Sequence, residues 1–179
     1  MKLMKTTKLS AFALVGALLS LITALAPSAE AGSLKANVFL VQAAVPRAGT
    51  EKALLSFARK NNARLLREAT DEEVKKRKWN ASLIVSFNQP VGDSEFTVLF
   101  YDVHDGPRRF VNDMATFVDD KKQKTFVQKV TMARPTFKPN RNMELVVTVH
   151  RSEVGKHKFG LIGEEIRRSG TVDFNDSGE

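Results

Sequence analysis

The sequence has no cysteine in its 179 residues, which excludes disulfide bridges, thiol catalysis and thiolate-bound metals. A chain of this length can still bury a core large enough to fold without cross-links. Histidine is also scarce, with three residues, and none stands beside an obvious nucleophile. The GxSxG, HExxH, P-loop and dinucleotide-binding glycine patterns are missing. We therefore expect no enzymatic activity and no cofactor, although two carboxylates that converge only in the folded chain would escape this search.

One long apolar run is present, and it lies near the start of the chain. Three lysines precede an apolar stretch from Ala11 to Ala26, which Pro27 ends. The following Ala29-Glu30-Ala31 is the small-x-small pattern that signal peptidases accept. The stretch is short for a membrane anchor and leads directly into the cleavage pattern. We therefore interpret residues 1–31 as a signal peptide rather than as an uncleaved anchor, and the lack of cysteine excludes a lipoprotein.

The expected mature chain, residues 32–179, is long enough for one domain of ordinary size. Its formal net charge falls from +8 to +6 when the three lysines and one glutamate of the signal peptide are removed. Basic charge outside the cytoplasm favours encounters with anionic polymers or lipid headgroups over nucleic acid. We expect an exported protein, periplasmic or extracellular and surface-associated, with no transmembrane segment after cleavage. Its expected partner is an envelope or secreted protein, and an anionic glycan or lipid headgroup is the alternative.

Residues 32–79 are predicted to form a small strand–helix portion. An apolar, β-branched stretch at 36–45 predicts a buried strand. Thr50 precedes a helical pattern at 51–60, and Asn61-Asn62 is a candidate left-handed end for that helix. The stretch 63–69 fits either a short strand or more helix.

From residue 80 onward the apolar period changes to two, which predicts strands separated by turns rich in Gly, Pro, Asn and Asp. Six such strands without intervening helices indicate a mainly β fold, an antiparallel β-sandwich of immunoglobulin-like or C2-like type. The strand–helix portion should pack on one edge or face of this sandwich, residues 80–174, and 175–179 form an acidic tail. The predicted strands are 81–87, 95–103, 108–118, 124–132, 143–151 and 156–164.

The stretch "KTFVQKVTMARPTFKPN" followed by "MELVVTV" resembles the C2 family of calcium-dependent lipid-binding sandwiches. The likeness lies in a basic strand, then a loop with proline and an aromatic residue, then an apolar strand. It covers about a third of the mature chain. The paired aspartate loops of that family are not convincingly present, so the resemblance implies a fold and transfers no site residue.

Two of the histidines, His150 and His157, flank the loop of the last predicted hairpin, 143–164. The register that we favour places Val147 opposite Phe159, because the apolar faces of both strands then meet in one core. A loop one residue shorter would place the two histidines opposite each other but would turn the apolar faces apart. We therefore expect a structural hairpin and no zinc pair.

The stretch "TDEEVKKRKW" suggests a contact surface for a partner or ligand. Four consecutive bases stand beside the only tryptophan, so Lys75, Lys76, Arg77, Lys78 and Trp79 are candidates, together with His104 in a later loop. A short helix that begins with the Thr70–Glu73 capping box would also explain the order of the charges, because bases are favoured at a helix C-terminus. The four phenylalanines Phe110, Phe117, Phe126 and Phe137 are assigned to the core rather than to a stacking platform.

The loop "YDVHDGPRR" contains the candidate metal ligands Asp102, His104 and Asp105. Two carboxylates and an imidazole at the tip of a sandwich could bind calcium or zinc. Ordinary turn chemistry at Asp105-Gly106 is the competing interpretation, and the spacing does not fit an EF-hand. A metal site would require side chains from different loops to converge on one point.

Overall fold

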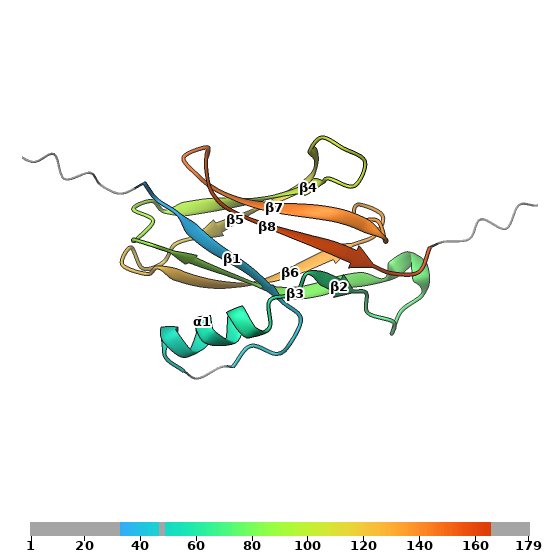
Figure 1. Ribbon diagram of the computed structural model, residues 1–179, viewed down its shortest axis with the longest axis horizontal. Helices are drawn as coiled ribbons and strands as arrows, with labels where there is room; N and C mark the ends of the chain where they lie inside the picture. Colours follow the sequence, from blue (N-terminus) through green and yellow to red (C-terminus); the bar gives the residue numbers. More distant parts are fainter. Residues whose placement is uncertain (1–32, 47–48, 166–179) are drawn as a thin grey trace, which may run out of the picture. The chain divides into compact units, whose positions relative to one another are not determined.

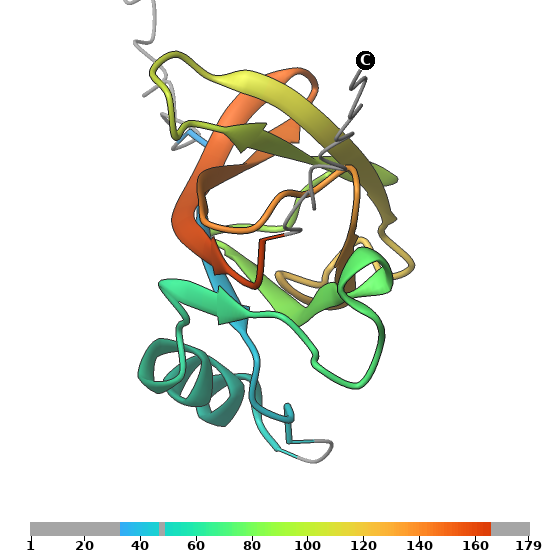
Figure 2. The ribbon, with the colours of Figure 1, turned by 90° about the vertical axis from the view of Figure 1, so that its right-hand side faces the viewer.

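The computed structural model describes residues 33–46 and 49–165. The predicted signal peptide, 1–31, and acidic tail, 175–179, lie outside the described residues. Two sheets form a β-sandwich (Figures 1 and 2), one with strand order β1-β3-β6 and the other with order β2-β8-β7-β4-β5. The elements are β1 Ala36–Val41, α1 Glu51–Lys60, β2 Leu65–Arg67, β3 Lys78–Phe87, β4 Glu95–Asp102, β5 Arg109–Phe117, β6 Thr125–Ala133, β7 Arg141–Val149 and β8 Ser152–Ile162.

The predicted mainly β sandwich with a small strand–helix portion is confirmed. All six strands expected after residue 80 are present, with β3, β7 and β8 beginning earlier than predicted. The sandwich is not wholly antiparallel, because β2 pairs parallel to β8, with Leu66 opposite Leu161. This pairing also resolves the stretch 63–69, which forms a short strand at the edge of the larger sheet.

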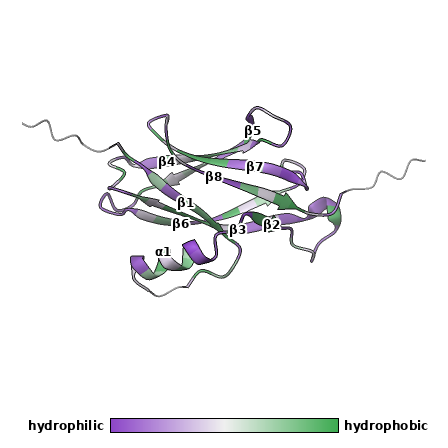
Figure 3. Ribbon diagram, viewed as in Figure 1, coloured by the Kyte–Doolittle hydropathy of each residue, from purple (hydrophilic) through white to green (hydrophobic). Residues whose placement is uncertain are grey.

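The core lies between the two sheets and follows the alternation of the strands. Leu83, Val85 and Phe87 of β3 are buried against the five-stranded sheet, whereas Ile84 faces the other way and packs with Ala58 of α1. The helix therefore covers the outer face of the three-stranded sheet (Figure 1). The hydropathy colouring in Figure 3 shows apolar segments along the strands and hydrophilic residues at the ends of α1.

Both ends of α1 are closed by side chains. Thr50 is the N-cap, and its hydroxyl accepts a hydrogen bond from Ala53 N at 3.3 Å. The expected left-handed C-terminus is wrong, because Asn61 has φ −107°. Its side-chain amide instead donates to Phe57 O at 2.9 Å. The next residue, Asn62, accepts from Leu40 N, which ties the end of the helix to β1.

The short helix expected at the "TDEEVKKRKW" stretch is also wrong. A single 3-10 turn, Val74–Lys76, is present, and its N-cap, Glu73, makes no side-chain capping bond. Lys78 and Trp79 already belong to β3, where Trp79 pairs with Met132 of β6. Strand pairing and burial of the indole thus override the local helix signal.

The hairpin of β7 and β8 has a different register from the one predicted, with Met143 rather than Val147 opposite Phe159. A two-residue turn explains the difference, since His150 and Arg151 have φ 49° and 65°, the left-handed conformations of a tight hairpin turn. The pairing then shifts by one residue just beyond the turn, as in a β-bulge.

The predicted consequence of that hairpin nevertheless holds. The observed register differs from the predicted one by an even number of residues, so Phe159 and the apolar residues of β7 still face one core. Met143 and Phe159 are both buried. His157 lies opposite Leu145, and His150 lies in the turn, so the two imidazoles do not face each other.

Within the described residues, no helix has both the length and the apolar character needed to cross a membrane.

Candidate functional site

Charged side chains gather at one end of the sandwich, onto which Figure 2 looks. There β3 begins, β6 ends, β7 begins and β8 ends. Two groups of contacts occupy this end. We call the first the buried ion-pair network (Glu68, Arg77, Trp79, Arg134 and Glu164). We call the second the basic hollow (Asp102, Arg109, Phe110, Phe137, Lys138 and Arg141).

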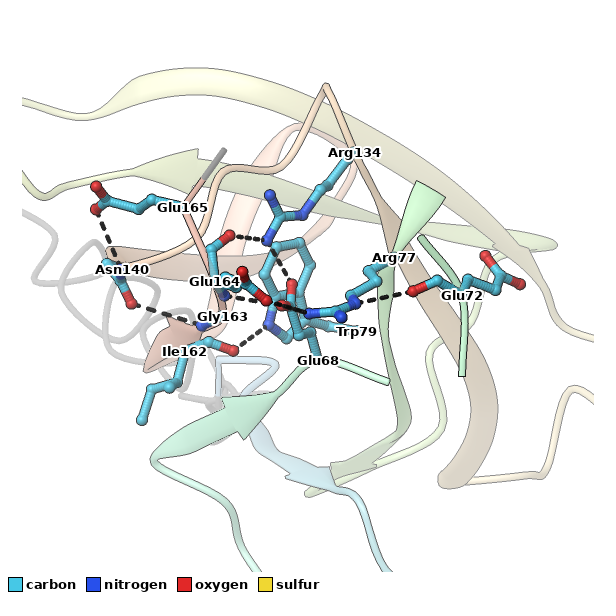
Figure 4. Close-up of polar contacts among 10 residues, drawn as sticks. All are labelled: Glu68, Glu72, Arg77, Trp79, Arg134, Asn140, Ile162, Gly163, Glu164 and Glu165. Carbon is cyan, nitrogen blue, oxygen red and sulfur yellow. Dashed lines mark hydrogen bonds and ion pairs between the residues drawn. The ribbon is translucent and has the colours of Figure 1, made fainter. Parts of the chain in front are cut away.

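The centre of the buried ion-pair network is the carboxylate of Glu68, which follows β2 (Figure 4). It accepts hydrogen bonds from the guanidinium groups of Arg134 and Arg77 and, at 2.8 Å, from Glu164 N. The side chains of Glu68 and Arg134 are each 4% exposed. Arg77 also pairs with the exposed carboxylate of Glu164, at 3.0 Å. The network thus joins β2, β3, β6 and the residues after β8.

Burial alone would raise the pKa of the Glu68 carboxyl, because it removes water from the charged form. The hydrogen bond from Glu164 N and the two arginines outweigh this effect and hold the pKa below its ordinary value. Glu68 is therefore a carboxylate at neutral pH. An anion already bonded by two arginines and a backbone amide has no acid–base role to offer, so this network is structural.

Trp79 does not lie on a contact surface. Its side chain is fully buried, its indole Nε1 donates to Ile162 O at 2.9 Å, and the Arg134 guanidinium lies 5.4 Å above the ring (Figure 4). The expectation that Trp79 would contact a partner is therefore wrong, because the indole is buried in the core and packs against Arg134 of the network.

The neighbouring basic run is divided rather than gathered into one patch. Arg77 belongs to the network, and Lys78 pairs with Glu72 at 2.7 Å. Hydrogen bonding to these carboxylates raises the pKa of both basic groups. Lys76 forms an exposed pair with Glu73, and Lys75 is exposed. Two of the four bases are thus already bonded to acids at partly covered positions.

The loop with the candidate metal ligands is organised around an arginine. Arg141 at the start of β7 donates from Nε to Asp102, at 3.0 Å, and from Nη2 to Asp105, at 2.6 Å. Asp102 also accepts from His104 N, and the His104 ring lies at the surface, with its Nε2 3.9 Å from Asp105. Within residues 33–46 and 49–165, no three acidic or histidine side chains converge as a metal ion requires. The guanidinium of Arg141 lies between Asp102 and Asp105, where the metal hypothesis would place a metal ion.

The basic hollow lies beside this loop and has a volume of about 230 Å³. Arg109 at the start of β5, Lys138 in the loop between β6 and β7, and Arg141 contribute positive charge to its lining. The buried residue Phe137 and the half-exposed residue Phe110 also line it. These bases and aromatic residues are scattered along the sequence. Their convergence depends on loop geometry, which the spacing of residues in the sequence does not reveal.

Two of the four phenylalanines assigned to the core are exposed. Phe126 and Phe137 are buried as expected, but Phe110 is 56% and Phe117 71% exposed. Both lie on the outer face of β5, the last strand of its sheet, where neither the core nor a further strand covers their side chains. The sequence "RFVNDMATF" contains a signal of this, since Asn112-Asp113 interrupt the alternation expected of a strand buried on one face.

Comparison with known proteins adds little to this geometry. No protein-family model matches the chain, and no curated protein matches it. Among solved structures, the chain is similar to an immunoglobulin-like protein from Pseudomonas aeruginosa, with 14% sequence identity and a TM-score of 0.36. The match covers 73% of this chain and 92% of that chain.

Proposed function

We propose that this chain is an exported, non-catalytic binding module that contacts another envelope or secreted protein through the open side of its sandwich. We define the open side as the outer flanks of β5 and β6, the last strands of the two sheets. The opposite flank is closed differently, because β1 of one sheet lies against β8 of the other. The open side thus offers a partner the unpaired backbone of two strands of nine residues each, whereas the edge strand β2 has three residues.

The distribution of exposed apolar side chains carries this proposal. In the described part of the chain, four large apolar side chains are exposed, and three of them, Phe110, Phe117 and Val127, lie on β5 or β6. The fourth, Leu65, lies on β2 at the far edge of the larger sheet. Exposed aromatic residues on an edge strand are typical of interaction surfaces, where they supply contact area at low conformational cost.

Strand addition onto β5 is the mode of binding that this geometry supports. The strand has nine residues, contains no proline and carries a single acidic residue between its ends. Phe110 pairs with Tyr101 and Phe117 with Glu95, which places both rings on the outer face, one toward each end of β5. A partner segment added in extended conformation would form backbone hydrogen bonds along β5 and pack its side chains between these rings.

Site-specific photo-cross-linking in the producing cells tests the proposal. A photoreactive phenylalanine analogue at position 117 should cross-link to one recurring exported protein, whereas the same analogue at position 65, a matched exposed apolar site, should not. A Phe110→Lys change in the first protein should abolish the cross-link. Cross-links to a second copy of this chain would assign the open side to self-association instead, and equal cross-linking from positions 117 and 65 would refute the proposal.

A further inference from the structure

The basic hollow contains more positive than negative charge. Asp102 lines it, and the Asp102 carboxylate is already bonded by Arg141. The second carboxylate nearby, Asp105, is bonded by the same guanidinium. Within the described residues, the side chains of Arg109 and Lys138 have no ion pair or hydrogen bond. Two bases that face one hollow without a carboxylate of their own form a site that an anion can complete.

The arginine between the two aspartates fixes one wall of the hollow. Arg141 and Asp102 are mostly buried, with side chains 21% and 13% exposed. Burial acts to raise the pKa of Asp102, but the hydrogen bonds from His104 N and Arg141, together with the charges of Arg141 and Arg109, lower it below the ordinary value. Asp102 therefore stays ionised at neutral pH and keeps Arg141 in place. The rigid pair means that an entering anion meets a preformed wall.

Apart from Thr136, the remaining lining is apolar. The ring of Phe137 is 3% exposed and packs edge-on against Phe100 of the core, with ring centroids 5.7 Å apart. Phe110 also lines the hollow, but its ring packs edge-on against Tyr101, at 6.1 Å, on the outer face of the sheet. A ligand in this hollow therefore meets positive charge from two bases and apolar lining that includes Val111 and Phe137.

We propose that the basic hollow binds a small organic anion, a phosphate or carboxylate group carried on a flat apolar body. Arg109 and Lys138 contact the anionic group, and Val111 and Phe137 contact the apolar body. The volume of about 230 Å³ is below the usual range of drug-sized pockets, which begins at roughly 300 Å³, so the ligand or the part of it that enters is small. The hollow meets the open side at Phe110, but its two bases have no part in strand addition.

Titration calorimetry of the purified protein with phenyl phosphate tests this inference, with inorganic phosphate as the anion alone. Phenyl phosphate should bind saturably and about tenfold more tightly than inorganic phosphate, because its ring is removed from water. Arg109→Gln and Lys138→Gln should each weaken phenyl phosphate binding about tenfold, the cost of losing one charged hydrogen bond. Lys129→Gln, a matched exposed base on β6, should leave the affinity unchanged.

A second variant separates the roles of charge and ring. Val111→Ala should weaken binding of phenyl phosphate and leave inorganic phosphate unaffected. The inference is overturned if phenyl phosphate shows no saturable binding up to about 10 mM, or if the Arg109→Gln/Lys138→Gln double variant binds as tightly as the unaltered protein. Because both bases are at the surface, circular dichroism should show that the variants fold as the parent does.

The source of the anion is distinguished by co-sedimentation with vesicles. Vesicles of phosphatidylglycerol that carry down the parent protein but not the double variant would identify a lipid headgroup, with phosphatidylcholine vesicles as the neutral control. Binding of phenyl phosphate without vesicle binding would identify a soluble ligand. Vesicle binding that persists in the double variant, without phenyl phosphate binding, would refute the site. Phe117→Lys should leave phenyl phosphate affinity unchanged, and the double variant should leave the cross-link from position 117 unchanged, so the two proposals can fail separately.

Discussion

The carboxylate of Glu68 accepts a hydrogen bond from the guanidinium of Arg134 where each side chain keeps 4% of its surface exposed. The two residues lie 66 positions apart in the sequence. Glu68 follows β2 of the five-stranded sheet, and Arg134 follows β6 of the three-stranded sheet. The pair therefore ties the two layers of the sandwich together at the end that carries the basic hollow.

Removing the negative charge at this point should be costly. Glu68→Gln leaves Arg134 buried without a counter-charge and leaves Arg77 with Glu164 as its remaining acidic partner. Loss of one partner of a buried ion pair costs about 3 kcal/mol or more, because the other charge stays desolvated. Urea denaturation at pH 7 should show a drop of this size in the free energy of unfolding. Glu164→Gln is the matched control: its side chain is 62% exposed, so the loss should stay below about 1 kcal/mol. Equal losses in the two variants would contradict a buried, structural Glu68.

The same carboxylate should make stability depend on pH in the acidic range. The pKa of Glu68 in the folded protein lies below its ordinary value of 4.5, so the folded state binds this proton less tightly than the unfolded state does. The stabilisation is therefore complete above pH 4.5 and is lost as the pH falls through the folded pKa. Melting temperatures between pH 7 and pH 3 should fall less steeply below pH 4.5 in Glu68→Gln than in the parent. Asp102 and Glu153 also have lowered pKa values, so the variant should retain part of the slope. Parallel curves for the two proteins would contradict the assignment.

The contrast between fold and network shows what the sequence could reveal. Alternation of apolar residues predicts the strands because successive side chains of a β-strand point to opposite faces of the sheet. The partners of Glu68 are set by the packing of two sheets, and nothing local marks them. Trp79 departs from the prediction for a related reason: the charges around it fit a helix, but burial of a large indole against Met132 and Ile162 stabilises a strand.

The hairpin and β5 illustrate two further limits. Apolar patterning fixes the face of a strand but not its register, because a slip by an even number of residues preserves the face. The turn conformation of His150 and Arg151 decided the register, and neither residue type signals a left-handed turn strongly. Phe117 was placed in the core because aromatic residues usually are buried, yet its strand is the last of its sheet, and strand order does not follow from sequence. The two bases of the basic hollow were present in the sequence as scattered charges, and the loop between β6 and β7 brought them together.

His157 provides a test of burial on the inner face of β8. Burial lowers its pKa below 6.5, outweighing the hydrogen bond between Nε2 and Ala63 O, at 3.2 Å, which raises it, and the nearby Arg64 lowers it further. The folded protein therefore binds this proton less tightly than the unfolded chain, so the contribution to stability is complete above pH 6.5 and is lost as the pH falls through the folded pKa. A nuclear magnetic resonance titration should show the His157 imidazole becoming protonated with a midpoint below pH 6.5. His157→Gln should flatten the loss of stability just below pH 6.5 without changing the later loss attributed to Glu68. A midpoint at or above 6.5 would show that the ring is not desolvated.

Gly155 tests the closed flank of the sandwich, where β8 passes β1. A Cβ atom added at Gly155 would lie 2.5 Å from Ala36 O and 3.0 Å from a methyl group of Val38, so the backbone of β1 would have to move. Overpacking of this kind typically costs about 1–3 kcal/mol, and Gly155→Ala should lower the free energy of unfolding by this amount in urea denaturation. Gly49→Ala is the matched control, because its Cβ would meet Ala53 at 3.8 Å, an ordinary contact. That variant should be neutral or slightly stabilised, since alanine restricts the unfolded chain more than glycine does. If both variants had the same stability, β1 and β8 would be less closely packed than described, and the flank opposite β5 and β6 would then be open as well.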